Sequence, residues 1–385
     1  MGTVGREIGL GLWKRGVDVH YLGWFSGSIQ NDMPFPVYPT QGNYYGSDKL
    51  NETILKIRPD ILLTIGDQWM VSYISDKNRL SKSVRQLFTW VGYIPIDGHT
   101  FGEKLPYGWE NTVNAMDYAV AYTKYGKRVI ENSCPDLDIP IIYHGVNTKE
   151  CFPLKEEHRV IFRKNLGIEE DTIVYLVVAR NQFRKNLPEI LKAWKIFKSK
   201  GNFNAKIWLH CSFNDPMGWK LDQIICNYKL EDDVLFFEDV AHSDGMRLLD
   251  RNKLNALYNI GDVFVLQSGE GFGLPTVEAM ACRKPVILLD HSANTELAEG
   301  RGETVKPICT MAGKYSTERP YPDINLLADK MAKFYKDKKL REKYGNAGYE
   351  FAKTITWDII SEQWYQYLDK VVNPLKHPIK MREVA

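Results

Sequence analysis

The sequence lacks the marks of a membrane-spanning, disulfide-linked or zinc-binding protein. No apolar run approaches the ~20 residues that a membrane-spanning helix needs. The start has no basic-then-apolar layout of a signal peptide. The cysteines are scattered, without a C-x-x-C pair or a histidine at zinc spacing, so we expect buried thiols in a reducing, cytoplasmic compartment. The six are Cys134, Cys151, Cys211, Cys226, Cys282 and Cys309.

The sequence also lacks an excess of either charge. With 50 basic and 48 acidic residues the formal net charge is +2, which gives no whole-protein field to attract nucleic acid. The tail is mildly basic at Lys376, Lys380 and Arg382, which leaves peripheral membrane contact open, although a solvated tail is the simpler interpretation. No short repeat or low-complexity tract is present. A chain of 385 residues, 44% of them hydrophobic, is long enough for two globular domains.

The most informative stretch is a glycine-rich turn within residues 268–279. Residues 262–266 before it are apolar and β-branched enough for a buried strand, and the residues after Pro275 are helix formers. The turn is therefore expected at the carboxyl end of a strand, where open parallel sheets bind their ligands. A purely structural turn between a strand and a helix is the alternative.

Several features of this turn suit an anionic ligand. Pro275 fits the first helical position, so free N–H groups should point back toward the turn and attract an anion. Those groups belong to Gly273, Leu274 and Thr276. Gly271 and Gly273 carry no Cβ, which lets a ligand approach the backbone closely.

Two acids and two cations are candidates for the same site. Glu270 in the turn and Glu278 in the helix could both reach one ligand. Arg180 closes an expected strand at residues 172–179, and Lys185 follows five residues later. A planar guanidinium and a compact ammonium together could neutralise a diphosphate. Arg184 could compete with Lys185 for that role, and a solvated basic loop is the alternative.

The motifs together resemble those of a known family. Glu270 and Glu278 form an E-x7-E pattern around Gly-Phe-Gly-Leu-Pro, and Glu-Ala-Met-Ala and Lys284-Pro285-Val286-Ile287 follow. This pattern resembles the donor-site signature of the retaining glycosyltransferases of family four, which have the GT-B architecture. The resemblance implies two Rossmann-like, doubly wound parallel-sheet domains facing each other across a cleft, with a C-terminal helix returning to the first domain.

The resemblance also implies roles for individual residues. Arg180 and Lys185 would contact the diphosphate of a nucleotide-sugar donor, Glu270 a sugar hydroxyl and Glu278 the ribose hydroxyls. The remaining donor-binding candidates in the turn are Gly271, Phe272, Gly273, Leu274 and Thr276. Base recognition is expected around residues 239–244.

Alternating helical and strand patterns indicate an α/β fold with parallel sheets in both halves. We expect an N-terminal acceptor-side domain at residues 1–153, a donor-binding domain at residues 154–354 and a returning helix at residues 355–385. The expected strands of the first half are residues 17–24, 60–65, 84–96, 118–122 and 139–143. Because glycines and a helix come first, with no strand before them, a first strand is expected to be missing from the sequence.

The first half supplies further candidates for the donor site. Asp97 and His99 follow its longest apolar run, and one of them would contact the donor sugar. We prefer Asp97 because it is nearer the strand, while capping of a helix is its alternative role. Gly2, Thr3 and Gly5 resemble the first glycine loop of the family.

The sequence therefore predicts a retaining transfer of a sugar from a nucleotide diphosphate to a glycan or lipid-linked acceptor. No metal is expected, because the two cations can neutralise the diphosphate, and the D-x-D pair of Asp136 and Asp138 is interpreted as a solvated loop. Three alternatives remain. They are a nucleotide-sugar binding protein without catalysis, a glycoside hydrolase using Glu270 and Glu278, and, more remotely, a nucleotide-sugar epimerase.

Overall fold

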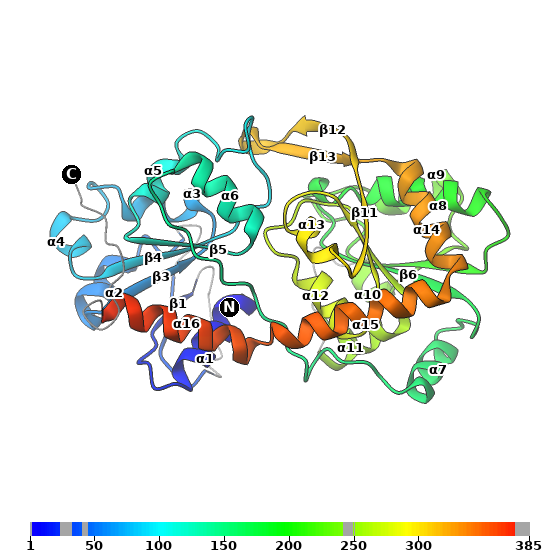
Figure 1. Ribbon diagram of the computed structural model, residues 1–385, viewed down its shortest axis with the longest axis horizontal. Coiled ribbons are helices and arrows are strands. Elements are labelled where there is room, and N and C mark those ends of the chain that lie inside the picture. The colour runs from blue at the N-terminus through cyan, green and yellow to red at the C-terminus, as the bar shows by residue number, and fades with distance from the viewer. Residues whose placement is uncertain (1, 24–32, 41–44, 242–248, 250, 374–385) are drawn as a thin grey trace. The chain divides into compact units, whose positions relative to one another are not determined.

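The computed structural model describes residues 2–23, 33–40, 45–241, 249 and 251–373, and the chain divides into two compact units. Unit 1 contains the chain up to Gly145 and again from Ile355 onward, and unit 2 contains Val146–Thr354. Figure 1 shows the elements of both units. The first boundary lies earlier in the chain than the expected position at residue 153.

Unit 1 is built on a parallel sheet of three strands in the order β3-β4-β5. These are β3 (Ile61–Ile65), β4 (Thr89–Ile94) and β5 (Tyr118–Ala121), and β1 (Tyr21–Gly23) pairs in parallel with β2 (Val37–Pro39). The helices are α1 (Thr3–Trp13), α2 (Leu50–Ile57), α3 (Gln68–Val71), α4 (Lys82–Arg85), α5 (Trp109–Asn114), α6 (Lys124–Ser133) and α16 (Trp357–Val372), with the 3-10 turn η1 (Ser72–Ile74). β4 is buried along nearly its whole length, as its apolar sequence predicts.

The first and last described helices of unit 1 pack against each other. Gly11 of α1 lies so close to Ser361 of α16 that a Cβ at Gly11 would come within 1.9 Å of the serine Oγ. Beside this contact, the Arg15 Nε donates to the Glu362 carboxylate over 2.8 Å. The close approach therefore depends on glycine at position 11.

Unit 2 contains a parallel sheet of six strands in the order β11-β10-β9-β6-β7-β8. Its strands are β6 (Ile173–Val178), β7 (Ala205–His210), β8 (Val234–Leu235), β9 (Val263–Leu266), β10 (Val286–Leu289) and β11 (Gly302–Val305). The parallel α/β architecture expected from the sequence is thus confirmed. An antiparallel hairpin of β12 (Pro307–Ala312) and β13 (Glu318–Pro322), with the turn η3 (Lys314–Ser316), was not expected.

Helices follow most strands of this sheet, as Figure 1 shows. They are α7 (Glu156–Asn165), α8 (Leu187–Ser199), α9 (Leu221–Tyr228), α10 (Glu238–Ala241), α11 (Arg251–Ile260), α12 (Leu274–Ala281), α13 (Ala293–Ala298), α14 (Ile324–Lys336) and α15 (Lys338–Thr354), with the 3-10 turn η2 (Phe183–Lys185). α15 lies close against the end of α12. A Cβ at Gly345 would come within 2.4 Å of the Arg283 carbonyl oxygen, so this packing needs glycine.

Several expectations on local structure were wrong. The apolar run at residues 84–96 is not one strand, because α4 occupies its start and β4 begins only at Thr89. Residues 139–143 form only an isolated bridge between Ile141 and Ala121, and in residues 17–23 the strand is confined to Tyr21–Gly23. Two cysteines are exposed instead of buried, Cys226 and Cys309, although all six are free thiols.

Candidate functional site

The strand order of unit 2 places a ligand-binding position between β6 and β9. From β6 the chain proceeds to β7 and β8 on one side, and it then returns to β9 on the other side of β6 before continuing to β10 and β11. Ligands of open parallel sheets bind outside the carboxyl ends of the two strands at such a reversal. The segment from Arg180 to Lys185 follows β6, and the glycine-rich turn follows β9, so the structure brings both sequence motifs to this position.

Glu270 is the centre of a buried polar cluster. Its Oε1 accepts hydrogen bonds from the Lys185 ammonium and the Ser268 hydroxyl. The Arg184 guanidinium lies 3.7 Å from the same oxygen and donates to the Gly269 carbonyl over 3.1 Å. The backbone N–H of Glu270 donates to the Ser292 Oγ over 2.8 Å. The carboxylate is therefore held by side chains of the segment after β6 and by Ser268, and the backbone of Glu270 is held by Ser292.

The charge of this cluster is set by two opposing effects. Burial alone raises the pKa of Glu270, but the neighbouring cations of Lys185 and Arg184 lower that pKa below its ordinary value. Glu270 is consequently an ionised hydrogen-bond acceptor at neutral pH. The sequence left open whether Lys185 or Arg184 would contact a diphosphate. In the structure Lys185 donates to the Glu270 carboxylate, and Arg184 lies beside it.

The glycine-rich turn ends in a left-handed residue. Gly273 caps α12 with φ +102° and ψ 58°, a conformation that side chains disfavour. The expected position of Pro275 was wrong by one residue, since α12 begins at Leu274 and Pro275 is second. The expected free N–H of Thr276 was also wrong, because it donates to the Gly273 carbonyl over 3.0 Å. Leu274 is half-buried, and among the remaining candidates Phe272 and Thr276 are buried.

Arg180 is held by a partner that the sequence analysis missed. Its Nε donates to Asp215 over 2.7 Å, and its Nη2 lies 3.4 Å from the second carboxylate oxygen. The Asp215 side chain is buried, whereas Arg180 is 44% exposed. This hydrogen bond raises the pKa of Arg180 and lowers the pKa of Asp215. Part of the Arg180 guanidinium, with its N–H donors, therefore remains exposed. Its direct partner is Asp215 and not Glu270.

Glu278 belongs to a second polar cluster. The Tyr258 hydroxyl donates to its Oε2 over 2.7 Å, and the Arg251 Nη1 lies 3.9 Å from its Oε1. Arg251 also lies 3.3 Å from Glu150. Burial raises the pKa of Glu278, while the tyrosine hydrogen bond and Arg251 act in the opposite direction. No sequence signal marked Tyr258 as a partner, because it stands in a segment rich in polar residues, RNKLNALYNI.

The candidates of the first half lie in unit 1, in two places. Asp97 and His99 follow β4, as expected, and the His99 Nδ1 lies 2.7 Å from the Tyr125 hydroxyl. Gly2 is the exposed cap of α1, and Thr3 and Gly5 belong to that helix. A Cβ at Gly5 would come within 2.7 Å of the Tyr21 hydroxyl oxygen, so close packing accounts for this glycine. The ligand roles proposed for these residues stay predictions.

Other candidates are placed as follows. Asp138 of the D-x-D pair is fully exposed, and Asp136 lies in the turn before it. Within residues 239–244, the side chain of Asp239 and residues 242–244 lie outside the described part of the structure, as do the tail residues Lys376, Lys380 and Arg382. In the described part, no three His, Cys, Asp or Glu side chains are placed to hold a metal ion, and no helix has the length and apolar character needed to cross a membrane.

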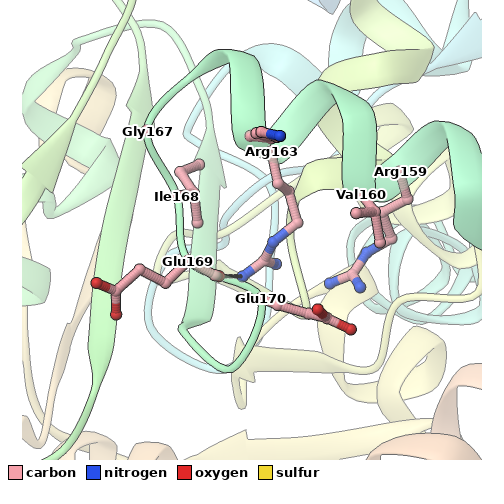
Figure 2. A pocket seen from close by; sticks show the side chains of 8 residues that line it. Arg159, Val160, Arg163, Gly167, Ile168, Glu169 and Glu170 are labelled. Atoms are coloured by element: carbon pink, nitrogen blue, oxygen red, sulfur yellow. Dashed lines mark hydrogen bonds between the residues drawn. The ribbon is translucent and has the colours of Figure 1, made fainter.

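A cavity of about 380 Å³ lies elsewhere, beside α7 (Figure 2). Arg163 points from α7 toward the loop after it, where it donates to the carbonyl oxygens of Glu169 and Thr172. It also lies 3.1 Å from Asp262, and both Thr172 and Asp262 precede strands. The cavity therefore lies at the amino ends of the strands, and the cluster around Glu270 lies at their carboxyl ends. The buried Arg163 attaches α7 to the amino ends through these contacts.

A family model matches the part of the chain that carries both clusters. The model describes glycosyl transferases group 1 and covers residues 159–351, half of the chain. The chain belongs to this family. An N,N'-diacetylbacillosaminyl-diphospho-undecaprenol alpha-1,3-N-acetylgalactosaminyltransferase of Campylobacter jejuni is 25% identical, over 59% of this chain and 53% of its own length. An uncharacterized glycosyltransferase of Methanocaldococcus jannaschii is 26% identical, over 46% of this chain and 45% of its own length. The chain thus spans about half the length of these two curated relatives.

Two solved structures share the fold over nearly the whole chain. Sucrose-phosphate synthase from Thermosynechococcus elongatus has a TM-score of 0.71 at 18% identity, covering 95% of this chain and 92% of its own. Anabaena HepE in complex with UDP-glucose has a TM-score of 0.69 at 17% identity, covering 96% and 97%. The expected GT-B fold is confirmed by this likeness.

Proposed function

We propose that this protein transfers a sugar from a nucleotide-diphosphate donor to an acceptor hydroxyl with retention of the anomeric configuration. The observation that carries the proposal is the cluster of Lys185, Arg184 and Glu270 outside the carboxyl ends of β6 and β9. It combines cations for a diphosphate with an ionised acceptor for a sugar hydroxyl. Membership of the group 1 family supports the same reaction.

In the proposed reaction, the bond between the anomeric carbon and the diphosphate oxygen breaks, and a bond to the acceptor oxygen forms. The acceptor attacks on the side of the leaving group, and its proton passes to the departing phosphate. Negative charge grows on the diphosphate as the bond breaks, so donors aimed there stabilise the transition state more than the ground state. We assign this task to Lys185, Arg180 and the backbone N–H groups of Gly273 and Leu274 at the start of α12.

Glu270 and Glu278 bind the donor in this proposal, and neither acts as a nucleophile. Glu270 accepts from a sugar hydroxyl, and Glu278 accepts from the ribose hydroxyls. Glu270 is buried and Glu278 is half-buried, and the donors already fixed on both carboxyl groups suit acceptors of hydrogen bonds. A divalent metal is not needed, because side-chain cations neutralise the leaving group. In unit 1, Asp97 or His99 would contact the donor sugar.

The chemistry of the relatives suggests the partner molecules. The Campylobacter enzyme is named for transfer of N-acetylgalactosamine to a lipid-linked diphosphate, and the Anabaena protein was solved with UDP-glucose. By analogy, the donor is a nucleotide sugar, and the acceptor is a glycan or a lipid-linked glycan. Peripheral contact with a membrane would follow from a lipid-linked acceptor.

The test is sugar transfer from a panel of labelled nucleotide sugars, with and without acceptor glycans. Acceptor-dependent transfer with retained configuration is expected, and the Glu270→Ala variant should lose it while remaining folded. Binding of a nucleoside diphosphate without transfer would favour a protein without catalysis. Release of sugar from a glycoside in the absence of a nucleotide donor would instead support a hydrolase.

A further inference from the structure

Glu278 is held by a hydroxyl that is itself fully buried. Tyr258 lies on α11, which leads into β9, and its hydroxyl donates to the Glu278 Oε2 over 2.7 Å. The tyrosine side chain is 0% exposed, so packing fixes the position of its ring and of the phenol oxygen. The second oxygen, Oε1, lies 3.9 Å from Arg251. One oxygen of the carboxylate is therefore tied to the interior, and the other remains for a further partner.

We propose that Tyr258 is a positioning residue for nucleotide binding, which holds the Glu278 carboxylate so that its second oxygen accepts from the ribose hydroxyls. The inference rests on the proposed function, since it takes Glu278 as the ribose acceptor. A carboxylate accepts from two hydroxyls only while it is ionised. The phenol can donate to a carboxylate oxygen but offers no charge of its own, so it stabilises the ionised form at low cost in desolvation.

The surroundings of Glu278 make this donor important. Burial raises the pKa of Glu278, and the charge of Glu150 adds to that effect. The Tyr258 hydrogen bond and Arg251 oppose it. Among the described residues, the buried thiols Cys151 and Cys282 also interact with Tyr258, and each raises the pKa of the phenol. Removal of the phenol oxygen should therefore raise the pKa of Glu278 further.

If Tyr258 had only a structural role, Tyr258→Phe would still destabilise the protein. A matched control is therefore needed. Tyr175 is equally buried in the same unit, and its hydroxyl donates to the Met331 carbonyl over 2.6 Å. Tyr175→Phe removes a buried hydrogen bond of the same kind, but that bond does not reach an ionisable group. The two variants should lose similar stability at acid pH and differ in how their properties depend on pH.

The first measurement is titration calorimetry of UDP and GDP between pH 6 and pH 8.5. For Tyr258→Phe we expect the loss of affinity between pH 8.5 and pH 6 to exceed that of the wild type, by up to about tenfold for each unit by which the pKa of Glu278 rises. Tyr175→Phe should show the same pH dependence as the wild type, since protonation of the nucleotide itself affects all three proteins alike. Parallel profiles for all three proteins would overturn the inference while leaving the proposed function intact. Failure of the wild type to bind any common nucleoside diphosphate, with ADP, CDP and dTDP tested as well, would overturn both.

The second measurement needs no nucleotide. A group whose folded pKa is raised contributes stability below its unfolded pKa, and that contribution is lost as the pH rises through the folded pKa. The loss in Tm of Tyr258→Phe should therefore grow from pH 5 to pH 8, and a Tyr258→Phe, Glu278→Gln double variant should not show this growth. A constant loss in Tm, equal to that of Tyr175→Phe, would show that Tyr258 does not control the charge of Glu278.

A replacement that keeps the oxygen guards against misfolding of Tyr258→Phe. Incorporation of 3-fluorotyrosine at position 258 makes the phenol a stronger donor without removing it. The pH profile of nucleotide binding should then move to lower pH, opposite to the effect of phenylalanine. A shift to higher pH, or none, would contradict the positioning role.

Discussion

The ammonium of Lys185 donates to the carboxylate of Glu270, although the two residues are 85 positions apart in the sequence. Lys185 follows β6 and Glu270 follows β9, and these two strands are neighbours in the centre of the unit 2 sheet. The cation thus comes from the segment after β6 and the acid from the segment after β9. Donor binding would bring a diphosphate to this ion pair, and the ammonium could then be shared between the carboxylate and the phosphate oxygens.

Replacement of Lys185 by methionine should abolish most transfer while keeping the fold. The variant removes a cation proposed to stabilise the leaving diphosphate, so we expect kcat to fall by about a hundredfold or more. Glu270 keeps Arg184 at 3.7 Å, so the free energy of unfolding should fall by less than about 3 kcal/mol. Transfer assays and urea unfolding measure the two effects. Lys338→Met, at a largely exposed position of α15, is the control, and an equal loss of kcat in both variants would contradict the role of Lys185.

The acid dependence of stability should report the charge of Glu270. Its folded pKa is below its ordinary value, so the stabilisation is present above about pH 4.5 and is lost as the pH falls through the folded pKa. Glu270→Gln lacks this ionisation, and the difference in Tm between wild type and variant should shrink as the pH falls below that value. Glu299→Gln, at an exposed position, serves as the control. A difference that stays constant down to pH 3 would refute the assignment of an ionised, paired Glu270.

Arg180→Lys separates the charge at position 180 from its geometry. Lysine keeps the positive charge. Unlike a guanidinium, however, it cannot donate to Asp215 and at the same time present further donors in the same plane. Binding of a nucleoside diphosphate should weaken by about tenfold, corresponding to roughly 1.4 kcal/mol. Calorimetry measures the affinity, and unfolding at the same pH shows whether Asp215 remains accommodated. Unchanged affinity would remove Arg180 from the diphosphate site.

Gly345→Ala should destabilise unit 2 even though alanine is the better helix former. Its Cβ would come within 2.4 Å of the Arg283 carbonyl oxygen, which belongs to the backbone and cannot move aside cheaply. We expect a loss of about 1–3 kcal/mol, as for overpacking in a core. The exposed neighbour Asn346 gives the control variant Asn346→Ala, which should be neutral or stabilising. Unfolding of both variants in urea decides the outcome.

The sequence predicted the parts of the fold that depend on local pattern. The strand, glycine turn and helix around Glu270 were placed nearly correctly, because apolar runs and glycines mark such junctions directly. The pairing of Arg180 with Asp215 and of Glu278 with Tyr258 was missed. Those pairs depend on the order of strands in the sheet and on the loops between them, which no short-range periodicity encodes. The same limit applies to the order β9-β6 itself, which decides where the site forms.

The hairpin of β12 and β13 shows a different limit. Its strands contain Pro307, Pro320 and Pro322, and β12 is exposed along most of its length, so neither composition nor burial pattern marked it as a sheet. Conversely, residues 139–143 are apolar enough for a strand, yet only Ile141 pairs, with Ala121. Strand propensity describes a residue that suits a sheet, but the partner strand must also be available.

The division of the chain has a consequence for synthesis on the ribosome. Unit 2 is one continuous segment, Val146–Thr354, and can complete its folding as soon as it has emerged. Unit 1 cannot, since α1 packs through Gly11 on Ser361 of α16, a helix that follows unit 2 in the sequence. While unit 2 is being synthesised, the nascent chain therefore carries an α1 without its partner. Early termination just after Thr354 would leave that half permanently unfinished.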